Sequence, residues 1–162
     1  MQLGEGVEWA VHVCVVLAVV PPDQVLPATK LAEYHELPAA YLAKQLQGLA
    51  GAGIVTSVPG RRGGYRLARP AAGITVLDIV RAVEGPAPAF RCSEVRQRGP
   101  AAVGPRHYRK PCGIARVMWA AEAAWREVLA ATTVHDLLVG VATDASPVSI
   151  RRSVKCVQEA VR

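Results

Sequence analysis

The order of apolar and polar residues predicts a mainly helical chain. Residues 6–20 are apolar on most sides, which indicates a buried helix that Pro21 and Pro22 end. Thr29 is a suitable N-cap for a short second helix over residues 30–35. The chain is therefore expected to begin with two helices joined by a short connection.

A third helix is expected to start at Pro38 and to end near Ala50. Leu42, Leu46 and Leu49 recur in it at helical spacing and would form its buried stripe. The opposite side of this helix is then available to a partner.

A hairpin follows the third helix. Residues 54–58 are rich in β-branched side chains and predict a strand, and residues 65–67 predict its return. The turn between them, residues 59–64, consists of proline, glycine and arginine. Two short helices, a tight turn and a hairpin with an Arg–Gly tip are typical of a winged helix–turn–helix. The predicted fold class is mainly α with a small β-wing.

The second half of the chain predicts further helices around one long loop. Thr75 and Asp78 have the spacing of a capping box, which predicts a helix through Val83. Residues 86–111 form an unusually long loop, and a loop of that length is either functional or disordered. Residues 114–131 have the periodicity of a long amphipathic helix.

Thr133 is expected to cap a shorter helix through Val141. The tail mixes basic and apolar residues and predicts either a weak helix or a disordered segment. The predicted organisation has four parts in chain order: a winged helix–turn–helix domain over residues 1–85, the loop over 86–111, the long helix with the helix after it over 112–142, and the tail over 143–162.

Charge gives the winged helix a candidate partner. The net charge is +6, and residues 37–77 contain no acidic residue. A one-sided positive field attracts a polyanion such as double-stranded DNA. A solvated basic face, or a winged helix used only for protein contacts, would explain the same pattern. The candidate DNA-binding residues are Lys30, Ala39, Ala40, Tyr41, Lys44, Gln45, Arg61, Arg62 and Tyr65.

These residues suit different parts of a DNA site. Small side chains let the third helix enter the major groove, where Gln45 could read adenine edges and Lys44 a guanine or a phosphate. Arg61 and Arg62 at the wing tip are suited to phosphates or a neighbouring minor groove.

Several other classes of protein are disfavoured. The longest apolar run, residues 13–20, is shorter than the roughly 20 residues of a membrane helix. The N-terminus lacks a basic region typical of a signal peptide, so a cytoplasmic protein is expected. Four cysteines are then more readily reduced, metal-bound or redox-active than paired structurally. No acid–base pair, nucleophile–histidine arrangement or phosphate loop indicates an enzyme.

Several motifs resemble those of the IscR/NsrR group of bacterial regulators in the Rrf2 superfamily. The resemblance covers residues 1 to about 131. The motifs are Gly6-Val7-Glu8-Trp9-Ala10, Tyr41-Leu42, Gly63-Gly64-Tyr65-Arg66-Leu67-Ala68-Arg69-Pro70, Ile74-Thr75-Val76-Leu77-Asp78-Ile79-Val80 and Val83-Glu84-Gly85-Pro86.

The resemblance implies a homodimeric winged-helix transcription factor that binds operator DNA. It also implies that the long helix pairs the subunits and that the loop before it holds an iron–sulfur cluster. Within the family the chain looks closest to the RsrR type, in which a [2Fe–2S] cluster senses redox state. Two features depart from the family: Pro38 stands where a hydroxyl residue is usual, and the loop has two cysteines where many members have three.

A [2Fe–2S] cluster needs four protein ligands, and nitrogen ligands replace thiolates in Rieske centres. Cys92 and Cys112 are the candidate thiolates. Glu8 and His12, four residues apart on an otherwise apolar helix, are the preferred other pair. In relatives an acidic ligand at the position of Glu8 comes from the other subunit. Alternatively, Glu8 and His12 simply hydrogen-bond to each other.

The remaining candidates receive other roles. His107 is the rival ligand, and Trp9 with His35 forms a candidate redox relay from the first helix toward the DNA-binding helix. Cys14 is expected to be an inert core residue. His135 is expected at the surface, and Cys156 has no assigned role. A cluster-free regulator that senses a small molecule, zinc or a thiol–disulfide change through Cys92 and Cys112 is the alternative function.

Overall fold

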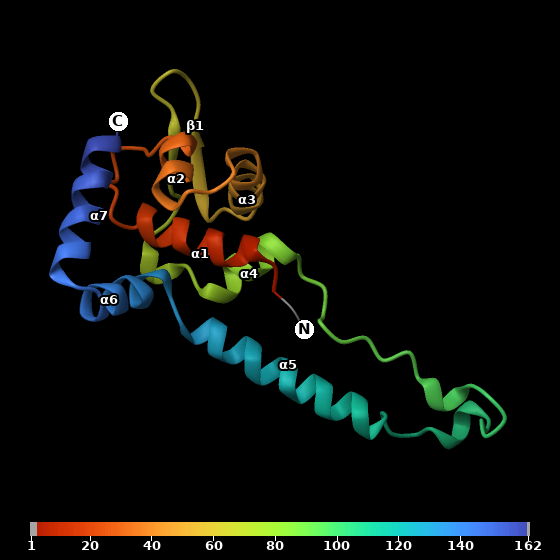
Figure 1. Cartoon of the computed structure of the whole chain (residues 1–162). Coiled ribbons are helices and arrows are strands. Elements are labelled where there is room, and N and C mark those ends of the chain that lie inside the picture. The colour runs from red at the N-terminus through yellow and green to blue at the C-terminus, as the bar shows by residue number, and fades with distance from the viewer. Residues whose placement is uncertain (1–2, 162) are drawn as a thin grey trace. The chain divides into compact units, whose positions relative to one another are not determined.

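The computed structural model describes residues 3–161 and is mostly helical, with one two-stranded sheet in this range (Figure 1). The predicted fold class is confirmed. The chain divides into two units. We call residues 3–86 with 129–161 the winged-helix unit, and residues 87–128 the loop–helix unit. No helix in the described range is long and apolar enough to cross a membrane.

The first three helices form the helix–turn–helix and supply most of its core. They are α1 (Glu5–Leu17), α2 (Ala28–His35) and α3 (Ala39–Gly51). Leu42, Leu46 and Leu49 of α3 are fully buried, as their spacing predicts. Thr29 lies inside α2, whose N-cap is Pro27, so its predicted role as the N-cap was wrong. Two further predicted bounds were also wrong. Helix α1 ends at Leu17 rather than residue 20, and Pro38 is the N-cap of α3 rather than its first residue.

The wing is an antiparallel hairpin of β1 (Val55–Val58) and β2 (Gly64–Leu67). An additional bridge pairs Tyr65 with Leu26, the segment that leads into α2. A Cβ added at Gly64 would lie 2.6 Å from the carbonyl oxygen of Leu26, so this close approach requires glycine. The base of the wing is thus fixed to the start of α2.

Two capping boxes position the helices that follow the wing. Helix α4 (Val76–Glu84) begins with the predicted Thr75–Asp78 box, and α6 (Val134–Asp144) begins with a Thr133–Asp136 box. Burial opposes ionisation of Asp78, but hydrogen bonds from Thr75 and Arg69 lower its pKa. A β-bridge between Thr75 and Thr133 joins the two helix starts within the winged-helix unit.

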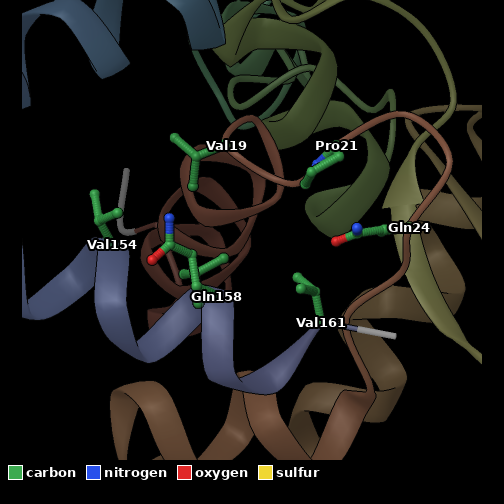
Figure 2. A pocket seen from close by; sticks show the side chains of 7 residues that line it. Val19, Pro21, Gln24, Val154, Gln158 and Val161 are labelled. Atoms are coloured by element: carbon green, nitrogen blue, oxygen red, sulfur yellow. The ribbon is translucent and has the colours of Figure 1, made fainter.

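The tail is an ordered helix, α7 (Pro147–Ala160), which settles the alternative left open by its composition. Val157 of α7 is buried in the core of the winged-helix unit. Between α7 and the segment after α1 lies a cavity of about 330 Å³ (Figure 2). Apolar side chains and two carboxamides line it: Val19, Pro21, Gln24, Val154, Val157, Gln158 and Val161.

The loop–helix unit contains most of α5 (Gly113–Ala131) and the loop before it. Ala115 is the only fully covered residue of α5, while Ile114, Val117 and Val128 are about two-thirds exposed. The loop has two short 3₁₀ turns, at Val95–Gln97 and Pro105–His107. An apolar helix surface this exposed calls for a partner.

Candidate DNA-binding surface and cysteine site

The N-terminal half of α3 presents an accessible surface. Ala39, Ala40, Tyr41 and Lys44 are all exposed, as expected for residues that enter a groove. The first turn of α3 carries no acidic residue that would repel a phosphate.

Gln45 does not belong to this surface, and its predicted exposure was wrong. The side chain is only 5% exposed and lies against α1, where a Cβ added at Gly6 would come within 2.6 Å of Nε2. The reason is helical spacing: Gln45 lies three residues after Leu42 and four before Leu49, on the buried face. Gln47 is exposed one turn beyond Lys44 and is the carboxamide available to bases.

We expect the two glutamines to respond oppositely to alanine substitution. Gln47→Ala should leave the unfolding temperature unchanged and relax the preference among operator sequences, because base contacts carry specificity. Gln45→Ala should lower the unfolding free energy by about 1–3 kcal/mol and retain sequence preference. Thermal unfolding and competition binding with base-substituted operators measure both effects. A change of sequence preference in Gln45→Ala alone would contradict the assignment.

The wing and α2 complete the basic surface. Arg61 and Arg62 are exposed at the wing tip, where they can reach phosphates. Tyr65 is half-buried and packs against the core, which indicates a structural role at the wing base. Lys30 is exposed on α2, but its Nζ lies 2.6 Å from a carboxylate oxygen of Glu33.

Glu8 and His12 are both exposed on α1, so the helix that was expected to be buried is accessible on this side. The polar residues mark the one face of α1 that the core does not cover. No hydrogen bond joins Glu8 to His12 in the described range, so the alternative of a simple internal pair is not observed. Both side chains are therefore accessible to a group brought by another chain.

His35, the last residue of α2, has one ring nitrogen that no hydrogen-bond partner satisfies. Its Nε2 is buried and has no hydrogen-bond partner. Burial and the neighbouring charge of His12 lower the pKa of His35, which favours the neutral imidazole. The rings of His12 and His35 lie 5.4 Å apart between centroids, so the structure brings these two imidazoles together. His35 therefore lies beside His12 as an imidazole whose Nε2 is covered by its own chain.

Trp9 connects α1 directly to α3. Its ring packs edge-on against Tyr41, with centroids 5.1 Å apart and an interplanar angle of 76°. Trp9 directly follows Glu8, and Tyr41 lies in the first turn of α3. A displacement of α1 near Glu8 would therefore reach the DNA-binding helix.

The cysteine site lies in the loop–helix unit. Cys92 and Cys112 are free and half-buried. The hydrogen bond with Glu94 raises the pKa of Arg96 in the same loop, and the charges of the two cysteines, when ionised, raise it further. No group of three or more His, Cys, Asp or Glu side chains that could hold a metal ion gathers within residues 3–161 of one chain. The two thiols alone therefore do not make up the four ligands of a cluster.

The structure also places the remaining candidate residues, which are His107, His135, Cys14 and Cys156. His107 is exposed and its Nε2 accepts a hydrogen bond from Arg106 at 3.2 Å, so that nitrogen is already used. Cys14 is fully buried, which raises the pKa of its thiol to about 12 and confirms the inert core residue. His135 and Cys156 are exposed.

Comparison with known proteins places these features in context. The sequence model of the Rrf2 family, described as iron-dependent transcriptional regulators, matches residues 3–140. Rv1287 of Mycobacterium tuberculosis, described as an HTH-type transcriptional regulator, is 33% identical over 141 residues, which are 86% of this chain and 83% of that protein. YwgB of Bacillus subtilis, described likewise, is 35% identical over 85 residues, and the match spans only 54% of that protein.

Solved structures show the same architecture. CymR, the global cysteine regulator of B. subtilis, superposes with a TM-score of 0.67 at 25% identity, covering 86% of this chain and 97% of CymR. T. potens IscR has a TM-score of 0.66 at 24% identity, covering 93% and 96% of the two chains. The described fold is thus similar to that of these two regulators over most of its length.

Proposed function

Because the chain belongs to the Rrf2 family of transcriptional regulators, we propose that it is a homodimer that binds operator DNA and senses redox state through a [2Fe–2S] cluster of the RsrR type. The chain is a DNA-binding regulator and not an enzyme. The observation that carries the cluster proposal is the pair of free, half-buried thiols, Cys92 and Cys112, in the loop that leads into α5.

The donor set fits a cluster with mixed ligands. One chain would supply the thiolates of Cys92 and Cys112, and its partner would supply the carboxylate of Glu8 and one imidazole. His12 is exposed and accessible for this role, whereas the Nε2 of His35 is buried within its own chain. When bound, the cluster supplies one-electron redox chemistry, at a potential above that of plant-type ferredoxins because two ligands are not thiolates.

The homodimer proposal rests on α5. Its exposed apolar residues, including Val117 and Val128, form a surface of the kind that a protein contact covers. A two-fold contact between two α5 helices would cover this surface on both subunits at once.

Trp9 and His35 connect the proposed cluster site to the DNA-binding helix α3. A change of charge beside Glu8 is costly in a poorly solvated interface, so α1 must respond by a proton shift or a small movement. Trp9 then carries the movement to Tyr41 and hence to α3, because the two rings are in contact. His35 neighbours His12 and ends the helix that precedes α3, so it forms the second part of this relay.

A one-electron titration of the anaerobically purified protein, run beside an operator-binding assay, tests the function. We expect visible absorbance that bleaches on reduction, and an operator affinity that differs at least several-fold between the two redox states while iron is retained. Equal affinity of both holo-states, with only the metal-free protein differing, would contradict the redox switch. It would indicate a response to cluster loss.

A second candidate function is suggested by the cavity beside α7. Its volume of about 330 Å³ and its lining of valines with two carboxamides suit a small uncharged molecule. Figure 2 shows the side chains of Gln24 and Gln158 on opposite sides of it. A protein that takes up neither iron nor sulfide, and whose operator binding responds to such a molecule, would favour this cluster-free regulator.

A further inference from the structure

Arg96 joins the two ends of the loop that carries the cysteines. Its Nε and Nη2 donate to the two carboxylate oxygens of Glu94 at 2.5 and 2.9 Å. Nη2 also donates to the backbone carbonyl of Lys110 at 3.1 Å. Glu94 lies two residues after Cys92, and Lys110 lies two residues before Cys112, so one guanidinium holds both flanks of the cysteine pair.

Tyr108 makes further contacts that hold the two ends of the loop together. The guanidinium carbon of Arg96 lies 5.1 Å from the centroid of the Tyr108 ring. The Tyr108 hydroxyl donates to the carbonyl of Arg96 at 2.5 Å and accepts from the amide of Val103 at 3.2 Å. A planar fork of donors can make several such contacts at once, which a lysine ammonium cannot reproduce.

Arg96 makes more contacts than a side chain in an ordinary exposed ion pair does. A surface pair such as Arg96–Glu94 alone contributes little to stability. Here the same side chain also binds the Lys110 carbonyl and stacks on Tyr108. The hydrogen bond with Glu94 raises the pKa of Arg96, and the charges of Cys112 and Cys92 raise it further. Arg96 therefore keeps its positive charge between Glu94 and Lys110, each two positions from one of the cysteines.

We propose that Arg96 is a positioning residue for the cysteine site, which closes the loop so that Cys92 and Cys112 are held together and places a permanent positive charge beside both. This inference deepens the proposed function and rests on it for its redox consequence. A fixed positive charge favours the added electron, because the potential of a cluster depends on the net charge around it. The closure itself does not require the cluster.

Three variants separate the charge from the geometry. Arg96→Gln removes the charge and the fork, Arg96→Lys keeps the charge and loses the fork, and Arg109→Gln removes a charge from an exposed position of the same loop. Each is made in the full-length chain with Cys156→Ser, because Cys156 is exposed and would react with thiol reagents.

Two measurements apply to all three variants. The first is the midpoint potential of the reconstituted protein. The second is the fraction of metal-free chains in which a short bifunctional thiol reagent bridges Cys92 to Cys112, quantified by peptide mass spectrometry. Arg96→Gln should lower the reduced-to-oxidised ratio at a fixed potential by about tenfold, equal to about 59 mV for one electron. It should also reduce bridging several-fold.

Arg96→Lys should retain most of the wild-type potential but lose bridging, and Arg109→Gln should match the wild type in bridging. An Arg96→Gln protein that equals Arg109→Gln in either measurement overturns the proposal. If the wild-type protein takes up no cluster, the proposed function fails, and the bridging measurement alone then decides the role of Arg96.

Discussion

Replacing Cys92 or Cys112 by alanine is expected to abolish the visible absorbance of the reconstituted protein. Each variant removes one of the two proposed thiolates and leaves the cluster with three of its four proposed protein ligands. The unfolding temperature of the metal-free protein should stay within a few degrees of the wild type. The reason is that both thiols lie outside the winged-helix unit and its core. Optical spectra with iron and sulfide analysis measure the first effect, and calorimetry measures the second.

Matched substitutions give this prediction its controls. Cys156→Ala removes an exposed thiol and should leave the spectrum unchanged. His12→Ala should remove or strongly alter the spectrum, whereas His35→Ala should retain the cluster because the Nε2 of His35 is buried within its own chain. His107→Ala should leave the cluster in place. A full cluster in either Cys92→Ala or Cys112→Ala would exclude the proposed thiolate pair.

The helical framework of the winged-helix unit was predictable because its signals are local. The leucine stripe of α3, the capping box at Thr75 and the β-branched strand of the wing each depend on residues a few positions apart. The fold class followed from their order along the chain. Helix ends were less accurate, because Leu17 and Pro38 lie where neighbouring segments decide whether one more turn is stabilised.

The error at Gln45 shows where side-chain chemistry conflicted with helical spacing. Its position between Leu42 and Leu49 already placed it on the buried face, but a carboxamide was expected to face a polar partner. The structure accommodates it because Gly6 of α1 has no side chain at the contact. That pairing joins positions almost 40 residues apart, and no local pattern indicates it.

The same limit explains the tail and the cysteine site. Helix α7 is stabilised by burying Val157 in the winged-helix core, which its mixed composition does not reveal. The sequence identified Cys92 and Cys112 by type alone. It gave no sign that Arg96, among several arginines in the loop, would contact both flanks, since those contacts depend on how the loop closes.

Placing glutamate at Val117 and Val128 together is expected to dissociate the proposed dimer and to weaken operator binding by about 10²–10⁴-fold. Both side chains lie on the exposed apolar surface of α5. In a two-fold interface each substitution occurs twice, so four carboxylates would lose water without a partner, at several kcal/mol each. A monomer binds only one half-site of the operator. In a dimer, binding of the first half-site raises the effective concentration of the second subunit at the other half-site, and the monomer loses this gain.

Analytical ultracentrifugation and operator titration measure these two losses. The matched control is Val139→Glu, which places the same charge on an exposed valine of α6. We expect it to sediment and bind DNA as the wild type does. The double variant should keep the unfolding temperature of the winged-helix unit, because that unit has its own core. A double variant that remains a dimer with full operator affinity would place the subunit interface on a surface other than α5.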